Sequence, residues 1–237
     1  MAALSDLQHH LAHYWALPYH ENEALKAKLD EVQAWQRARI ERTHAELFGM
    51  PKNQEMANYF LTQLYGGDEF KQLAEQLQRI VPKAQKLERF APAAALETGS
   101  MAIYAAILAI ELDLHLAQWF AEHQLAVDEH TMLDAYRAVN ESEARRAQII
   151  NLKEVCYRTD KYINSFLLQK AFALAKGAAY RHHYQPLYDF INAGFVAMRP
   201  LDSVKDFIDP FCKREFEIID HVHTKDNHDT AKMFGVS

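Results

Sequence analysis

Apolar residues recur at intervals of three and four along almost the whole chain, which is the spacing of one face of an α-helix. Leu25, Leu29 and Val32 show the pattern early, and Leu73 and Leu77 continue it further along. Only seven glycines and seven prolines occur among the 237 residues, well below average usage, so tight turns are few and the elements between them are long. The sequence therefore predicts an all-α fold.

Start and stop signals divide the chain into about eight or nine helices. They are expected over residues 4–15, 22–49, 51–65, 73–80, 92–125, 128–136, 140–166, 187–198 and 204–223. The helix that follows Pro92 is the most apolar, so we expect it to form the buried centre of a single-domain bundle. That domain is predicted to span residues 1–223, and the polar residues 224–237 are expected to form a frayed tail.

Two helix starts carry recognisable capping signals. Asp128 is placed to cap the helix that begins after it. Asn140, followed three residues later by Glu143, resembles a capping box and predicts a helix start there.

Charge and cysteine usage limit the classes of function. The formal net charge is −6, and the basic residues of segments such as 37–41 and 143–146 are spread among acidic ones, so no nucleic-acid partner is expected. Cys156 and Cys212 show no metal-binding or disulfide spacing, which suits a reducing cytoplasm. The N-terminus lacks the pattern of a signal peptide. The longest apolar run has ten residues, too short for a membrane span of about 20.

The letters Gly66-Gly67-Asp68-Glu69-Phe70 spell the motif that names the diguanylate cyclases. A cyclase carries this motif on a β-hairpin of an α/β domain, whereas here it lies between two helical patterns. We therefore expect the two glycines to end one helix and Asp68 to cap the next. The sequence does not predict a diguanylate cyclase.

The stretch "NYFLTQLYGGDEF", residues 58–70, resembles the signature segment of the FFLEELY-motif proteins, an uncharacterised bacterial family. Residues 35–48, 135–152 and 187–199 are also similar to that family, so the resemblance covers most of the chain. Tyr59 and Thr62-Gln63 depart from the phenylalanine and the two glutamates of the name-giving pattern. The resemblance implies relatedness but no activity or cofactor.

A metal-dependent oxidase of the ferritin-like or haem-oxygenase-like kind is the alternative that the sequence leaves open. Such proteins hold iron or manganese with acid–histidine pairs three or four residues apart on facing helices. The candidate ligands are Glu41, His44, Glu111, His115, Glu217 and His221. Acids three positions before a histidine are, however, no more frequent than this composition produces by chance, so no cofactor is expected.

Three acids lie in apolar surroundings, namely Glu97, Glu111 and Asp113. A buried charge is costly unless it is paired. These acids therefore form either an ion-pair network with arginines such as Arg39, Arg137, Arg145 and Arg146, or a ligand pocket in the core. The aromatic residues are expected to pack in the core, with residues 180–188 as their most exposed part.

No nucleophile motif and no phosphate-binding loop occurs in the sequence. The sequence thus favours a cytoplasmic protein that binds a protein partner or a small ligand without catalysis. The residues expected to bind are Trp35, Arg39, Thr43, His44, Tyr65, Glu111 and Arg137. A homodimer formed through an apolar helix face is compatible with the pattern.

Overall fold

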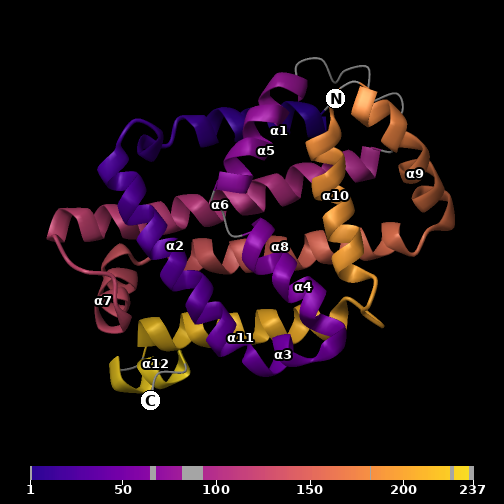
Figure 1. Ribbon diagram of the computed structural model, residues 1–237. Coiled ribbons are helices and arrows are strands. Elements are labelled where there is room, and N and C mark those ends of the chain that lie inside the picture. The colour runs from indigo at the N-terminus through magenta and orange to yellow at the C-terminus, as the bar shows by residue number, and fades with distance from the viewer. Residues whose placement is uncertain (1, 65–67, 82–92, 182, 225–226, 235–237) are drawn as a thin grey trace.

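The computed structural model describes residues 2–64, 68–81, 93–181, 183–224 and 227–234. These residues are largely helical and include no β-strand, which confirms the predicted all-α class (Figure 1). The longer helices are α1 (Ala2–Trp15), α2 (Glu23–Thr43), α5 (Asp68–Ile80), α6 (Ala93–His123), α7 (Glu129–Val139), α8 (Ser142–Ile163), α9 (Phe166–Arg181), α10 (Gln185–Met198) and α11 (Lys205–Thr224). The shorter ones are α3 (Ala45–Gly49), α4 (Gln54–Tyr59) and α12 (Asn227–Met233). The described residues thus hold more helical segments than the eight or nine predicted.

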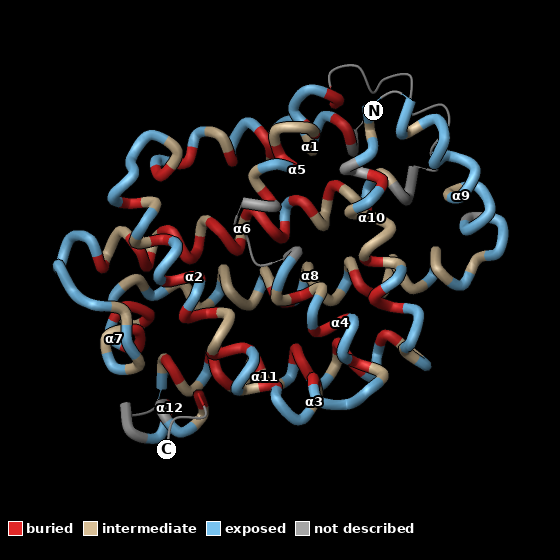
Figure 2. The backbone as a smooth tube through the Cα atoms, in the orientation of Figure 1, coloured by how far each residue is buried: buried red, intermediate tan, exposed pale blue. Residues whose placement is uncertain are grey.

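Helix α6 packs against α1, α2, α7 and α8. Residues such as Ile107, Leu112 and Phe120 are almost fully buried, and α6 is the most continuously buried of the long helices in Figure 2. By length and composition alone, Leu96–His123 could cross a membrane. However, 67% of its most apolar window is buried inside the protein, which is the pattern of a core helix.

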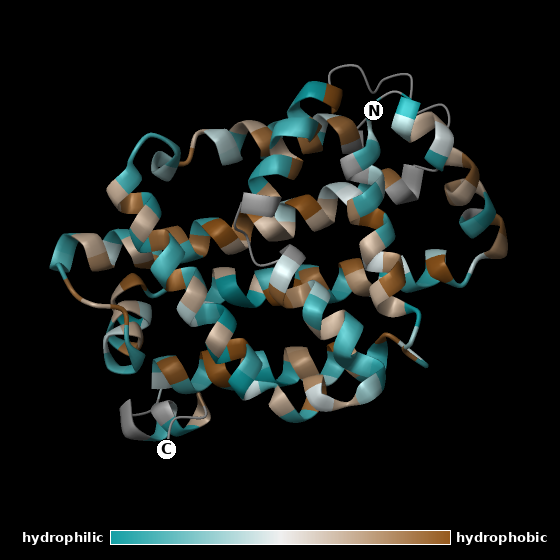
Figure 3. Cartoon of the chain, in the orientation of Figure 1, coloured by the Kyte–Doolittle hydropathy of each residue, from teal (hydrophilic) through white to brown (hydrophobic). Residues whose placement is uncertain are grey.

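The buried apolar residues form two clusters. The first joins α1, the start of α2, α5 and α6, with Tyr14 and Phe120 among its largest members. The second joins the end of α2 with α3, α4 and α11 around Phe207 and Phe211. Figure 3 shows hydrophobic and hydrophilic residues alternating along most of the helices. Gln36 and Arg39 of α2 lie between the two clusters along the chain, and both of these polar side chains are buried.

Three predicted boundaries are wrong. The helix expected over residues 22–49 is interrupted at His44, whose backbone leaves the helical range (φ −113°, ψ 16°) while its side chain enters the core. Asn140 adopts a left-handed conformation (φ 53°) and ends α7 instead of starting α8, because asparagine tolerates this conformation at a helix C-terminus. The predicted helix after Pro51 is a short 3₁₀ turn, then α4, then a π-helical turn over Phe60–Leu64.

The C-terminal residues differ from the frayed tail that was predicted. Residues 227–233 form α12, which packs against α7 and α11. Thr230 and Phe234 are fully buried, and the Phe234 ring lies 5.4 Å from the Trp35 ring. Burial of one aromatic side chain can order an otherwise polar segment, and the local composition gave no sign of it.

The cap predicted for the motif letters at residues 66–70 lies partly outside the described residues, because 65–67 are not among them. Helix α5 is described from Asp68 onward, so Asp68 is its first helical residue. Asp128 does cap α7, as predicted.

Replacing Asp128 by alanine is expected to lower the free energy of unfolding by about 1 kcal/mol. The Asp128 carboxylate accepts hydrogen bonds from the backbone N–H groups of His130 (2.9 Å) and Thr131 (3.0 Å), and the Thr131 hydroxyl oxygen accepts one from the Asp128 backbone N–H (3.0 Å). These bonds lower the pKa of Asp128. Urea denaturation measures the change, with Glu122→Ala at the exposed end of α6 as the control. Equal stabilities of the two variants would contradict the role of the cap.

Candidate functional site

The first group of polar residues in the core surrounds Glu215 of α11. Glu215 Oε1 accepts from Arg39 Nη1 at 2.5 Å and lies 2.7 Å from His44 Nε2. All three side chains are buried. Burial alone would raise the pKa of Glu215, but Arg39 and His44 outweigh it and lower the pKa to about 2. Because an ionised carboxylate can only accept, His44 carries its proton on Nε2.

A second group continues from Arg39 to Asp113 of α6. Arg39 Nη2 donates to Gln36 Oε1 (3.4 Å), and Gln36 Nε2 donates to Asp113 Oδ1 (3.0 Å). Arg145 Nη1 of α8 lies 3.5 Å from the same oxygen. Burial raises the pKa of Asp113, although Arg145 and Gln36 oppose the shift. Asp113 Oδ2 is buried without a hydrogen-bond partner among the described residues.

These side chains connect α2, α6, α8 and α11 through a layer of polar contacts inside the fold. They do not line either of the two surface pockets described for the molecule, one between α4, α5 and α10 and one at the ends of α2 and α6. For Asp113, the geometry therefore fits the ion-pair network of the two alternatives that the sequence left open. Glu97 and Glu111 differ from that prediction: Glu97 is exposed beside Arg158 (3.5 Å), and Glu111 is partly exposed beside His13 (3.1 Å).

The residues expected to bind a partner do not form one exposed surface. Arg39 and His44 are interior, so a partner cannot reach them without opening the core. Thr43 Oγ1 donates to the carbonyl oxygen of Arg39, one turn earlier in its own helix (2.9 Å). Arg137 Nε donates to the carbonyl oxygen of Val222 (2.7 Å). Tyr65 lies outside the described residues.

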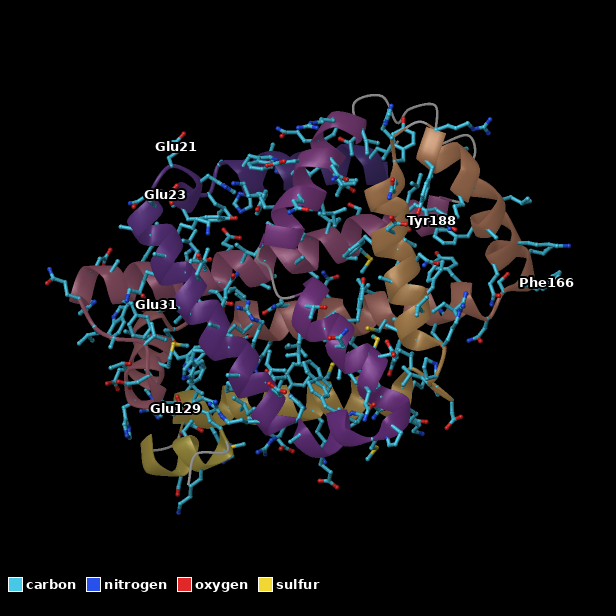
Figure 4. All side chains as sticks on the ribbon, viewed as in Figure 1. Glu21, Glu23, Glu31, Glu129, Phe166 and Tyr188 are labelled. Atoms are coloured by element: carbon cyan, nitrogen blue, oxygen red, sulfur yellow. The ribbon has the colours of Figure 1, made fainter. Side chains whose placement is uncertain are left out.

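Trp35 is buried, with 9% of its surface exposed. Its Nε1 donates to Glu129 at the start of α7, and Arg42 Nη2 donates to the other oxygen of that carboxylate (2.5 Å). Figure 4 shows Glu129 at the end of the molecule where α7 and α12 lie. Trp35 thus connects α2 to α7 through Glu129 and to the residue that follows α12 through the Phe234 ring.

The candidate metal ligands are not brought together. Among the residues that the structure describes, no three His, Cys, Asp or Glu side chains are placed to hold a metal ion. Glu41 is exposed, His115 pairs with Glu141 (2.7 Å), and His221 Nδ1 lies 3.0 Å from the carbonyl oxygen of Glu217. His44 is bound to Glu215 as above. Each histidine therefore has a separate structural contact.

A pocket of about 540 Å³ lies between α4 with its π-helical turn, α5 and α10. This volume is in the range of small-molecule sites. Its lining residues are Glu55, Asn58, Tyr59, Thr62, Phe70, Gln72, Leu73, Gln76, Asp189, Phe190, Ala193, Val196 and Ala197. The ring centroids of Tyr59 and Phe190, two of these lining residues, are 6.1 Å apart. A π-helical turn is rare and is frequently found at functional sites.

The polar lining of this pocket has one sign of charge. It includes the carboxylates of Glu55 and Asp189, and no Lys, Arg or His among the described residues lines it. Gln76 Oε1 is buried with no hydrogen-bond partner in the described part of the chain. A buried carbonyl oxygen of this kind is costly unless it accepts a hydrogen bond. The pocket therefore suits a ligand that donates hydrogen bonds or carries positive charge.

Gly194 of α10, which has no side chain, allows α10 to come close to Tyr59 of α4. A Cβ atom at this position would lie 3.2 Å from Tyr59 Oη, tighter than an ordinary contact. Burial raises the pKa of Tyr59, so the hydroxyl stays protonated there. Residue-type spacing could not reveal this pocket, because its two walls are more than a hundred residues apart in sequence.

Comparison with known families gives one match. A model of a domain of unknown function, DUF8198, matches residues 16–229. The chain belongs to the DUF8198 family. No curated protein and no solved structure matches it. The DUF8198 match includes every residue that lines the pocket and every residue of the buried polar network, so both features lie within the family domain.

Proposed function

We propose that this DUF8198 protein is a cytoplasmic binding protein without catalysis, and that the pocket between α4, α5 and α10 holds its ligand. The observation that carries the proposal is that two segments far apart in sequence, residues 58–70 and 187–199, supply most of the lining of one pocket, which also holds an unpartnered buried amide oxygen. Asn58, Tyr59, Thr62 and Phe70 come from the first segment. Asp189 to Ala197 come from the second.

The ligand class follows from the lining. Two carboxylates and an unpartnered amide oxygen favour a donor, and the absence of cations among the described lining residues disfavours an anion. The rings of Tyr59 and Phe190 and the side chain of Leu73 provide an apolar wall. A primary amine with an aromatic or alkyl body satisfies both requirements.

The cysteines support a binding role over thiol chemistry. Cys156 and Cys212 are both free and buried. Burial raises the pKa of Cys212 to about 12, so the thiol is protonated at neutral pH and is a poor nucleophile. Free, inert thiols also agree with the proposed cytoplasmic location.

Calorimetric titration with phenethylamine and tyramine as probes tests the proposal, with phenylacetate as the anionic counterpart. Gln76→Leu is expected to weaken amine binding about tenfold, because a hydrogen bond to a charged group is lost. Ala193→Trp is expected to fill the pocket and abolish binding. Gln78→Leu, exposed on the same helix and outside the pocket, is the matched control.

Two outcomes would sink this proposal. One is binding of phenylacetate as tight as that of the amines, since the lining would then not select by charge. The other is unchanged amine affinity in both Gln76→Leu and Ala193→Trp, because the probes would then bind elsewhere.

A further inference from the structure

Helix α9 is exposed over almost its whole length although eleven of its sixteen residues are apolar. Phe166, Leu167 and Leu174 are 70%, 77% and 80% exposed, the three most exposed large apolar side chains among the described residues. The helix lies at the outer edge of the molecule, and Figure 4 shows Phe166 directed away from the other helices. Such an exposure is unfavourable for a helix that faces only water.

The opposite face of α9 holds it in place. The Phe172 ring stacks on the Tyr188 ring at 4.2 Å and meets the Phe195 ring edge-on at 4.9 Å. The Tyr180 hydroxyl donates to Asp189 Oδ1 (2.9 Å). Leu174 follows Phe172 by two positions, which places it about 200° around the helix axis from Phe172. Because the contacts of Phe172 hold that face of α9 against α10, Leu174 points outward.

The charge of this region has a single sign. Residues 161–188 contain Lys161, Lys170, Lys176 and Arg181 but no acidic residue, in a chain whose formal net charge is −6. Lys170 Nζ lies 5.2 Å from the centre of the Phe166 ring, so positive charge sits directly beside the exposed apolar side chains. An apolar helix face flanked by lysine and arginine is the arrangement of helices that lie in the interface of anionic membranes.

We propose that α9 binds the protein to the surface of anionic phospholipid membranes, with Phe166, Leu167 and Leu174 inserted among the headgroups. The basic residues select for negative lipid. A second copy of the chain fits this face less well, because a two-fold contact places the same patch on both sides and would bring the lysines together.

Vesicle co-sedimentation of the full-length protein tests the proposal. The vesicles are phosphatidylcholine alone, or phosphatidylcholine and phosphatidylglycerol in equal parts. We expect binding to the anionic vesicles, weak binding to the neutral ones, and release of the bound protein at about 0.5 M salt, where charges are screened within about 4 Å. The double variant Leu167→Glu/Leu174→Glu is expected to lower the partition coefficient by at least about tenfold.

The control variant is Ile150→Glu, which replaces an apolar side chain that is 59% exposed on α8. It is expected to bind vesicles as the wild type does. Circular dichroism checks that each variant keeps its helix content, which is expected because the replaced side chains are already exposed. The Lys170→Glu/Lys176→Glu variant separates charge from apolar insertion and is expected to lose the preference for anionic vesicles.

The proposal is overturned if the wild type fails to sediment with anionic vesicles at low salt, or if it binds both vesicle types equally. It is also overturned if sedimentation velocity shows a wild-type dimer that Leu167→Glu/Leu174→Glu converts to a monomer, since a second copy would then cover α9. Vesicle binding unaffected by that double variant would likewise assign the contact to another surface.

Discussion

Replacing Glu215 by alanine is expected to lower the free energy of unfolding by about 3–5 kcal/mol, the range for removing one partner of a buried ion pair. Arg39 lies 2.5 Å and His44 2.7 Å from the same Glu215 oxygen, and both are buried. Without the carboxylate, the guanidinium of Arg39 is left in the core beside an imidazole. Equilibrium denaturation in urea at pH 7 measures the change.

The matched control is Glu217→Ala, two residues further along α11. Glu217 is 44% exposed and its nearest cation is Arg214 at 3.4 Å on the same helix. Such a pair contributes about 0.5 kcal/mol or less. If Glu215→Ala proves too unstable to purify, Glu215→Gln keeps the volume and an acceptor and is expected to lose less stability.

A variant that removes both charges gives the sharper test. Arg39→Met/Glu215→Leu replaces the pair by apolar side chains of similar size, a change that is often neutral or stabilising. We therefore expect it to be more stable than Glu215→Ala alone. A Glu215→Ala loss below about 1 kcal/mol, with no recovery in the double variant, would show that water reaches this group.

The same network shows why sequence alone located only part of it. Glu111 and Asp113 are two positions apart on one helix, which places them about 200° apart around its axis. Burying one therefore exposes the other, and only the packing partners of α6 decide which. Asp113 faces Gln36 and Arg145, whereas Glu111 reaches His13 near the surface. The apolar sequence context predicted buried acids at these positions but could not tell which of Glu111 and Asp113 is buried.

Helix existence was easier to predict than helix boundaries. The periodicity of α6 and the cap at Asp128 are local signals, and both predictions hold. The interruption at His44 depends on a contact with Glu215, 171 residues away, and no local pattern encodes it. Asn140 is favourable both as an N-cap and in a left-handed C-cap, so its position in the sequence was ambiguous.

Helix α9 was not predicted, and the reason bears on its proposed role. Its apolar residues do not line up on one buried face. Phe172 packs against Tyr188 on the inner side, whereas Phe166, Leu167 and Leu174 are exposed on the outer side. A helix that divides its apolar residues between two faces gives a weak periodic signal. The pocket escaped prediction for a different reason, since its walls come from distant segments.

Acidification is expected to remove about 3 kcal/mol of stability through Glu215 alone. The folded pKa of about 2 lies below the ordinary value of 4.5. Because the folded pKa is depressed, this stability is fully present above about pH 5 and is lost as pH falls through the folded pKa. Urea denaturation at intervals between pH 6 and pH 2 measures the free energy of unfolding of the wild type and of Glu215→Ala. The difference between the two free energies should shrink toward low pH.

Asp113 changes the dependence of stability on pH in the opposite direction to Glu215, which provides an internal control. Burial raises its folded pKa, so its ionised form is unfavourable in the folded state and that penalty is relieved as pH falls. Asp113→Asn keeps an oxygen for Gln36 Nε2 and removes the titration. The variant should therefore lose stability more steeply in acid than the wild type. Two buried carboxylates with oppositely shifted pKa values must change the slope of stability against pH in opposite directions. Stability profiles of the wild type and Glu215→Ala that run parallel would therefore contradict the assignment of Glu215. A profile for Asp113→Asn that is shallower than that of the wild type would contradict the assignment of Asp113.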